Sequence, residues 1–195
     1  NNSESAKYAL SKGFSRVILA RETQINEIKA IAKLTETEVF VHGALCSSFS
    51  GHCYISSFVG GNSGNRGLCK QPCRRAYTLE SSENKGKYAI SLSDLCLIDK
   101  LKDLKEAGVK SVKIEGRMRT PEYVASVVKA YRQAIDDGIA DTKEIKRTFN
   151  RGDFTLGYPF GVAKNIVSDK IQNHKGIKVG TVRKLSDNNR IIVET

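Results

Sequence analysis

Apolar residues along the first 140 positions fall into short continuous runs that alternate with runs of helical spacing. Short segments rich in apolar residues at 16–20, 38–41, 88–92 and 111–114 predict four strands, the first of them buried. Three of them are followed by apolar residues three or four positions apart, which predicts a helix after each. Strands that alternate with helices through short links are typical of parallel βα units.

Helix start and stop signals support this division. Thr23 and Ser93 are expected N-caps, and Thr120-Pro121 places proline at the first helical position after a cap. Gly108 and Gly138 are expected to end the second and third helices. The predicted apolar faces comprise Ile25, Ile28, Ile31 and Leu34, then Leu97, Leu101 and Leu104, then Val124, Val127, Val128, Tyr131 and Ile135.

Four βα units make half of a (β/α)8 TIM-like barrel, and right-handed crossovers predict a parallel sheet in chain order. A half-barrel leaves two open sheet edges, so we expect either a second copy of the chain or a missing N-terminal half-barrel as partner. The end of the chain differs, because 176–182 and 190–193 flank a turn at 187–189 and predict a β-hairpin. We therefore expect a barrel core over 1–160, a connector over 161–174 and the truncated start of a small β domain over 175–195.

Composition is that of an ordinary globular protein. The chain has 195 residues, of which 39% are hydrophobic and 27% charged, which excludes disordered and collagen-like classes. Its apolar runs are far shorter than the ~20 residues of a membrane-spanning helix, and it begins without a charged-then-apolar leader. We expect a cytoplasmic protein without membrane contact, and a chain that opens without Met suggests a fragment or a processed product.

Positive charge is abundant and uneven. Lys and Arg number 32 against 21 Asp and Glu, a net charge of +11. No acid occurs between Glu38 and Glu80, whereas Arg66, Arg74 and Arg75 lie there. Such a segment attracts polyanions or anionic small molecules, although a solvated basic face is the plainer alternative for the basic residues after 160.

The acid-free segment also holds four of the five cysteines, in a Gly- and Ser-rich loop that runs to about residue 76. Its spacing lacks the paired C-x2-C knuckles of zinc ribbons, and an odd cysteine count argues against a disulfide framework. Scattered thiolates suit an iron–sulfur cluster; a reactive thiol and inert buried cysteines stay open as alternatives. The cysteines are Cys46, Cys53, Cys69, Cys73 and Cys96.

In parallel βα folds the site lies at the carboxyl ends of the strands, and charged side chains occur at those ends here. Glu115 is a candidate for proton transfer, and Arg21 or Arg117 for a two-pronged contact with a carboxylate. A structural Glu–Arg ion pair is the alternative. His42 is a candidate base, a ligand or a hydrogen-bonded anchor.

Five segments of the chain stand out together. They are VFVHGALCSSFSGHCYISS at 39–57, GNRGLCKQPCR at 64–74, SDLC at 93–96, KIEGRM at 113–118 and FNRG at 149–152. In this order they resemble the signature of peptidase family U32, the collagenase-like proteases, and the resemblance covers about residues 10–160.

The resemblance implies a barrel core whose last four βα units are present here, followed by a small β domain. It implies either RNA base hydroxylation, giving 5-hydroxyuridine in tRNA or 5-hydroxycytidine in rRNA with prephenate as possible co-substrate, or a collagenase-like peptidase. It also implies a [4Fe–4S] cluster, which oxygen removes easily. The implied ligands are Cys46, Cys53, Cys69 and Cys96, with Cys73 as the alternative.

The residues themselves favour the RNA reaction over proteolysis. A peptidase needs an activated nucleophile or a metal-bound water, and the sequence has neither a Ser-His-Asp order nor a His-Glu-x-x-His motif. A non-catalytic scaffold is a third possibility. Under the RNA hypothesis the expected catalytic residues are Glu115, Arg117 and His42, the substrate-binding residues are Arg21, Arg66, Arg74 and Arg75, and the base-stacking candidates are Phe49, Tyr54, Phe58 and Tyr77.

Overall fold

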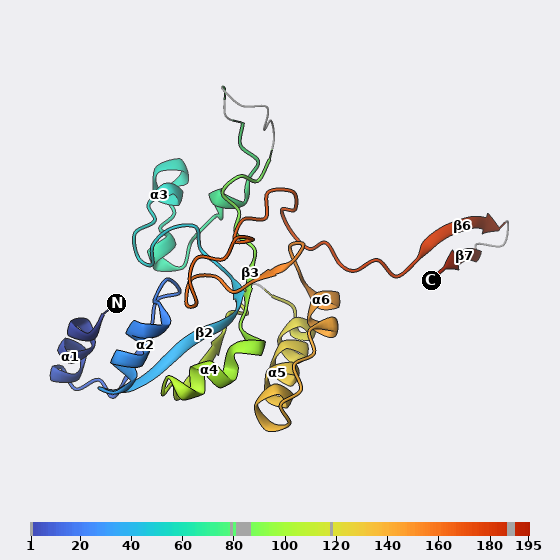
Figure 1. Cartoon of the computed structure of the whole chain (residues 1–195). Helices are drawn as coiled ribbons and strands as arrows, with labels where there is room; N and C mark the ends of the chain where they lie inside the picture. Colours follow the sequence, from blue (N-terminus) through green and yellow to red (C-terminus); the bar gives the residue numbers. More distant parts are fainter. Residues whose placement is uncertain (1, 79, 81–86, 118, 187–189) are drawn as a thin grey trace.

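The computed structural model describes residues 2–78, 80, 87–117, 119–186 and 190–195. Its helices are α1 (Ser3–Ser11), α2 (Ile25–Ala32), α3 (Ile55–Gly60), α4 (Leu101–Glu106), α5 (Pro121–Asp136) and α6 (Lys143–Thr148), with 3-10 turns at Gly64–Arg66, Pro72–Arg74 and Ile98–Lys100. Its strands are β1 (Arg16–Ile18), β2 (Glu36–Ala44), β3 (Asp94–Cys96), β4 (Ser111–Ile114), β5 (Phe154–Thr155), β6 (Thr181–Ser186) and β7 (Arg190–Glu194). Figure 1 shows α1 and α2 beside one another at one end of the sheet, and α5 and α6 at the other.

Strand β2 is the centre of the five-stranded sheet. Its first residues pair in parallel with β1, and Glu38 to His42 pair in parallel with β4 on the opposite edge. Its last residues pair with β3, which runs antiparallel, and β3 then pairs in parallel with β5. Glu38 pairs with β1 on one side of β2 and with β4 on the other, and His42 pairs with β3 and β4 in the same way. Strands β1 and β3 therefore lie one after the other on the side of β2 that is opposite to β4.

The prediction of a half-barrel is therefore confirmed only as a mixed α/β fold with a partly parallel sheet. The parallel pairing of β1 with β2 was expected, but the all-parallel order along the chain is wrong, and the described residues form no closed barrel. The predicted strand at 88–92 is mostly irregular, because its backbone pairs with a distant segment: Ser93 donates to Ile166 at 2.8 Å and Ser168 to Ser91 at 2.7 Å. The strand begins instead at Asp94.

The other element predictions hold more closely. Strand β4 has the expected bounds, and α5 begins after Thr120, whose hydroxyl accepts from the Tyr123 backbone. Two caps differ, because Gln24 rather than Thr23 precedes α2, and Ser93 precedes a strand instead of a helix. The core forms where the apolar face of these helices meets β2 and β3; its fully buried side chains include Ile28, Ile31, Val41, Leu95, Leu97, Leu104, Val127 and Tyr131.

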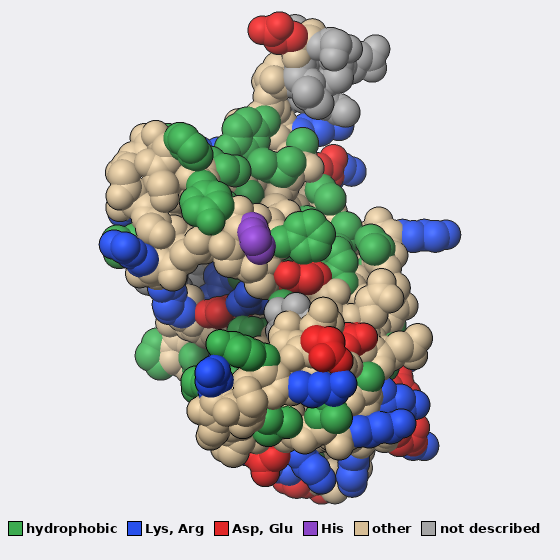
Figure 2. All heavy atoms as spheres, turned by 90° about the vertical axis from the view of Figure 1, so that its left-hand side faces the viewer, with side chains coloured by type: hydrophobic (Ala, Val, Ile, Leu, Met, Phe, Trp, Pro, Cys, Tyr) green, Lys and Arg blue, Asp and Glu red, His purple; other side chains and the backbone are tan. Residues whose placement is uncertain are grey.

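The cysteine loop, defined here as residues 45–76, leaves the end of β2 and carries α3. It exposes several large apolar side chains, and Figure 2 shows apolar groups spread over this face of the molecule. Phe58 is 90% exposed and Phe49 72% exposed, so the predicted stacking aromatics of this loop are accessible. Tyr54 and Tyr77 are also exposed, but the Tyr77 hydroxyl donates to the carbonyl of Pro72 at 2.9 Å.

The end of the chain contains the predicted hairpin as a separate two-stranded sheet of β6 and β7, but its first strand begins at Thr181, so most of the predicted strand at 176–182 precedes it. Its expected turn at 187–189 lies outside the described residues. Figure 1 shows the hairpin at the end of an extended segment that leads away from the five-stranded sheet. The preceding segment first packs back on the core, where Tyr88 donates to Asp169 and Lys175 donates to Asn150.

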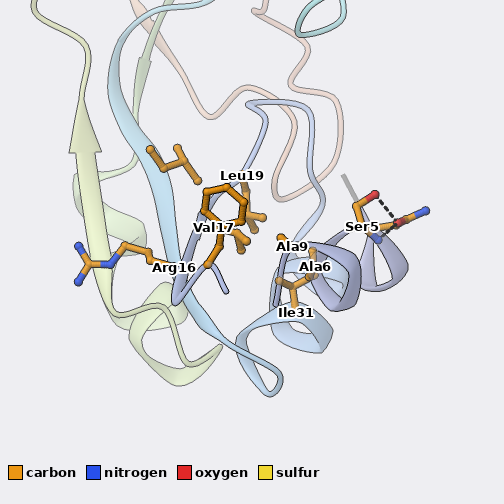
Figure 3. Close-up of a pocket in the computed structure, with 10 residues that line it drawn as sticks. Ser5, Ala6, Ala9, Arg16, Val17, Leu19 and Ile31 are labelled. Atoms are coloured by element: carbon orange, nitrogen blue, oxygen red, sulfur yellow. Dashed lines mark hydrogen bonds between the residues drawn. The ribbon is translucent and has the colours of Figure 1, made fainter. Parts of the chain in front are cut away.

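No helix in the described part of the chain is both long and apolar enough to cross a membrane. A pocket of about 290 Å³ lies between α1, β1 and α2 (Figure 3). Val17, Leu19 and Ile31 give it a mainly apolar wall, with Arg16 as its charged residue. Its lining holds none of the side chains that the sequence singles out for chemistry.

Candidate functional site

A cavity of about 590 Å³ lies at the carboxyl ends of β2 and β4, as the position of sites in βα folds predicts. We call it the arginine cavity. Its charged lining residues are Arg21, Arg74, Glu115, Arg117, Arg119 and Arg151, and its thiols are those of Cys46, Cys69 and Cys73. Figure 2 shows basic and acidic side chains gathered in a hollow beneath the apolar surface of the cysteine loop.

Glu115 is held in the wall of this cavity by two arginines. One carboxylate oxygen lies 3.2 Å from the Arg21 guanidinium, and the other accepts the backbone N–H of Arg117 at 3.0 Å. Arg21 also stacks on the Phe40 ring at 4.1 Å, and the Arg117 guanidinium donates to the carbonyl of Gly67 at 2.8 Å. The ion pair between Arg21 and Glu115 lines the cavity itself, so the structural ion pair and the candidate site, which the sequence offered as alternatives, occupy the same place.

Two lining arginines lie outside the set of candidates from the sequence. Arg119 stacks on Phe149, with its guanidinium carbon 3.5 Å from the ring centroid. Arg151 donates to the buried carboxylate of Asp94, and Arg119 lies 3.8 Å from the same oxygen. Asp94 lies in the SDLC segment and Arg151 in the FNRG segment. Their place in segments that match the family was the one sequence signal that could have identified them as site residues.

Burial dominates the electrostatics of this group. It raises the pKa of Asp94, while the charges of Arg151, Arg119 and Arg74 act in the opposite direction. Burial also lowers the pKa of Arg151 to about 10, so that this guanidinium remains charged at neutral pH. The contact between Arg151 and Asp94 thus lies in a poorly hydrated environment, where an unpaired charge would be costly.

Arg74 is a structural residue in this geometry and does not offer a free cation to RNA. It is buried, and its guanidinium donates to the Ser91 hydroxyl at 2.7 Å, to the Leu45 carbonyl at 2.8 Å and to the Leu92 carbonyl. Arg66 and Arg75 are exposed and lie outside the cavity lining. The structure therefore separates Arg74 from the two other arginines that were predicted to contact RNA.

Four cysteines of the cysteine loop lie next to the arginine cavity. A second pocket of about 470 Å³ adjoins the arginine cavity, and it is lined by Cys46, Cys53, Cys69 and Cys73. Burial raises the pKa of the Cys46 thiol, and the neighbouring Cys73 and Cys53 add to this effect. The Cys69 sulfur accepts the backbone N–H of Gln71 at 3.3 Å.

Cys96 lies elsewhere. It ends β3, where a helix capped by Ser93 was expected, and is buried in the core, where the Tyr131 hydroxyl lies 3.8 Å from its sulfur. The structure thus groups Cys73, the alternative ligand, with the other three cysteines. All five cysteines are described and unpaired, and no three His, Cys, Asp or Glu side chains of the described residues are arranged to hold one metal ion. Four soft thiols around one space nevertheless fit an iron–sulfur cluster by their chemistry.

His42 belongs to the core and does not line either pocket. It lies within β2, its ring packs against Tyr123, Tyr131 and Phe154, and its Nδ1 lies 3.4 Å from the Tyr131 hydroxyl. Burial, together with the charge of Arg119, lowers the pKa of His42 to about 3. A neutral, enclosed imidazole does not reach the cavity, so of the predicted roles the geometry favours that of a hydrogen-bonded anchor.

Comparison with known proteins gives the family. Residues 1–168 match the family model described as Peptidase family U32. The chain is 40% identical over 150 residues to the protein named 23S rRNA 5-hydroxycytidine C2501 synthase from Escherichia coli, a match that covers 74% of this chain and 23% of that protein. No solved structure matches the chain.

Other relatives are named for different activities. The chain is 37% identical over 153 residues to tRNA hydroxylation protein P1 of Bacillus subtilis, covering 72% of this chain and 36% of that protein. It is 35% identical over 190 residues to a protein named Collagenase from Porphyromonas gingivalis, covering 83% and 45%. The chain thus spans less than half the length of these three relatives. From the match over 1–168, the chain belongs to peptidase family U32.

Proposed function

We propose that the chain contributes the thiol and anion-binding part of an RNA base hydroxylase, with tRNA or rRNA as substrate. The observation that carries the proposal is the juxtaposition of a four-cysteine pocket with an arginine cavity that contains Glu115. Relatives named as a 5-hydroxycytidine synthase and as tRNA hydroxylation proteins support the same reaction class.

A [4Fe–4S] cluster would be held by Cys46, Cys53, Cys69 and Cys73, the four thiols that share a pocket. When bound, it would supply redox chemistry beside the arginine cavity. The ligand set differs from the one implied by the family resemblance only in the exchange of Cys96 for Cys73.

The side chains of this chain provide the remaining functions. Arg21 and Arg117 flank the cavity and would orient a carboxylate co-substrate such as prephenate, because guanidinium groups bind carboxylates in a two-pronged geometry. Glu115 contacts the Arg21 guanidinium and the Arg117 backbone N–H, and it would accept or return a proton. The exposed Phe49, Tyr54 and Phe58 would stack on an unpaired base, and Arg66 and Arg75 would contact phosphates.

Proteolysis is the second candidate, because other relatives carry the name Collagenase. The described part of the cavity offers thiols and arginines but no histidine that would activate a nucleophile. This absence favours the RNA reaction, and the experiment below measures both activities.

The test uses the full-length protein, purified without oxygen, and Ser variants of Cys46 and Cys53. We expect each variant to lose iron and sulfide, and cells that rely on it to lose 5-hydroxyuridine or 5-hydroxycytidine, measured by mass spectrometry of RNA nucleosides. Ser is expected to fail because a hard hydroxyl replaces a soft thiolate poorly. Gelatin digestion is followed in parallel. Full nucleoside levels together with lost gelatin cleavage would make the peptidase the correct function.

Glu115→Gln separates the two parts of the site. Because Glu115 belongs to the arginine cavity and is no thiol ligand, we expect the variant to keep its iron and to form less hydroxylated nucleoside. Loss of iron from Glu115→Gln would show that the carboxylate supports the thiol pocket instead of the reaction.

A further inference from the structure

Arg119 differs from the other arginines of the cavity in what its guanidinium contacts. Arg74, Arg117 and Arg151 each donate to a carbonyl or carboxylate oxygen at hydrogen-bonding distance, and Arg21 is paired with Glu115. Within the described residues, the only acid near the Arg119 guanidinium is Asp94, at 3.8 Å, beyond an ordinary hydrogen bond. Its guanidinium also donates no hydrogen bond to another described residue, so within that part of the chain its donor hydrogens remain available to a ligand.

The position of Arg119 is nevertheless fixed. Its guanidinium carbon lies over the Phe149 ring, 3.5 Å from the centroid, and 5.5 Å from the centroid of the Tyr123 ring. The side chain is only 15% exposed. A guanidinium held by stacking keeps its edge free for hydrogen bonds, which is the arrangement that planar recognition of a carboxylate requires.

Asp94 is placed to hold this arrangement together. It is fixed by β3, where it pairs with Ala44 of β2 and Phe154 of β5, and it is 2% exposed. One oxygen contacts Arg151 and faces Arg119, while the other has no partner among the described residues. The buried carboxylate lets two guanidinium groups lie close to one another that would otherwise repel.

Charge in the cavity remains strongly positive after this pairing. Five arginines line it, opposed by Glu115 in the lining and by Asp94 behind Arg119 and Arg151. The excess suits a ligand with two negative charges, and about 590 Å³ is the size of a small-molecule site.

We propose that Arg119 is an anion-binding residue of the cavity, that it binds a carboxylate of a small organic dianion, and that Asp94 and Phe149 position it. The inference deepens the proposed function and rests on it for the kind of ligand. Binding of a dicarboxylate needs neither a cluster nor RNA, so a direct binding measurement separates the failure of this inference from the failure of the proposed reaction.

The experiment titrates the full-length protein with malonate, a small dicarboxylate, by calorimetry, with dimethyl malonate as the uncharged probe of similar shape. We expect binding of malonate only, and a loss of affinity of about tenfold or more in Arg119→Gln. Arg119→Lys should recover only part of the affinity, because an ammonium lacks the planar fork. Arg147→Gln makes the same charge change on exposed α6 and should alter affinity less than about twofold.

If Asp94 positions Arg119, its replacement should change the affinity for malonate in the direction opposite to that expected from charge alone. Asp94→Asn removes a negative charge near the cavity and would tighten anion binding if charge alone mattered; we expect weaker binding, because Arg119 and Arg151 lose their common anchor. Phe149→Leu leaves the charge of the cavity unchanged and should also weaken binding. This variant tests the positioning of Arg119 if Asp94→Asn does not fold. Unchanged affinity in Arg119→Gln, or tighter binding in a folded Asp94→Asn, would overturn the proposal.

Discussion

The guanidinium of Arg74 donates a hydrogen bond to the carbonyl of Leu45 at 2.8 Å and so ties the segment of Cys73 to the end of β2. A second bond at 2.7 Å reaches the Ser91 hydroxyl on the far side of the cysteine loop. Arg74 therefore joins three parts of the chain that are distant in sequence and that meet at the thiol pocket.

Removal of Arg74 is expected to destabilise the protein, whereas removal of its neighbour is not. Arg74→Gln would leave buried carbonyls without donors, at about 1–3 kcal/mol for each unsatisfied group. Arg75→Gln, at an exposed position, should change the free energy of unfolding by less than about 0.5 kcal/mol. Urea denaturation of both variants measures the difference. Equal stability of the two would show that the Arg74 bonds contribute little.

The local parts of the fold were predictable from the sequence because their signals are local. Within residues 111–114, Val112 and Ile114 alternate with polar residues, and this segment forms β4; Thr120-Pro121 marks the start of α5. The run at 88–92 has the same apolar character, yet its pairing depends on Ile166 and Ser168, more than 70 positions away. No local pattern could show that the strand would begin only at Asp94 and run antiparallel.

The candidate site was predictable to the same extent. Arg21 and Glu115 directly follow strands, so the strand-end rule placed them together. Arg119 and Arg151 come from a segment before α5 and from one after α6, and only the folded chain brings them to Asp94. Among the three roles predicted for His42, the sequence could not choose, because only the fold shows that β2 continues to Ala44 and that His42 is buried inside the strand.

Gly43 is expected to be essential at the contact between β2 and the segment after β4. It has a φ of 111°, and a Cβ there would lie 2.5 Å from the carbonyl oxygen of Glu115. Gly43→Ala would combine an unfavourable backbone conformation with a backbone clash, so we expect a loss of about 2–4 kcal/mol in unfolding free energy. Denaturant unfolding of the variant measures this loss.

Gly51 provides the matched control. It also has a positive φ, 80°, but a Cβ there would meet no atom within 4 Å. Gly51→Ala should therefore cost only the conformational part, about 1 kcal/mol. Similar losses in the two variants would mean that the Glu115 backbone moves aside without cost.

His42 is expected to make the protein sensitive to mild acid. Its pKa is about 3 in the folded chain against an ordinary value of 6.5, so below about pH 6.5 the unfolded chain binds a proton that the folded chain does not. Stability should therefore fall as the pH falls from 6.5 towards 3. Between about pH 7 and pH 4.5, wild type should lose about 2–3 kcal/mol more than His42→Gln, measured by denaturant unfolding at each pH. Parallel pH profiles would show that His42 becomes protonated without unfolding.

The two alternative fourth ligands, Cys73 and Cys96, are expected to respond differently to the same substitution. Cys73 lines the thiol pocket with Cys46 and Cys69, whereas Cys96 is buried beside Tyr131. Cys73→Ser should therefore abolish iron binding in the anaerobically purified full-length protein, with little change in the unfolding of the cluster-free form. Cys96→Ser places a hydroxyl in the core, so it should keep its iron and lower stability by about 1–3 kcal/mol. Iron analysis and urea denaturation of both variants decide the matter: iron retained in Cys73→Ser but lost from a folded Cys96→Ser would make Cys96 the fourth ligand.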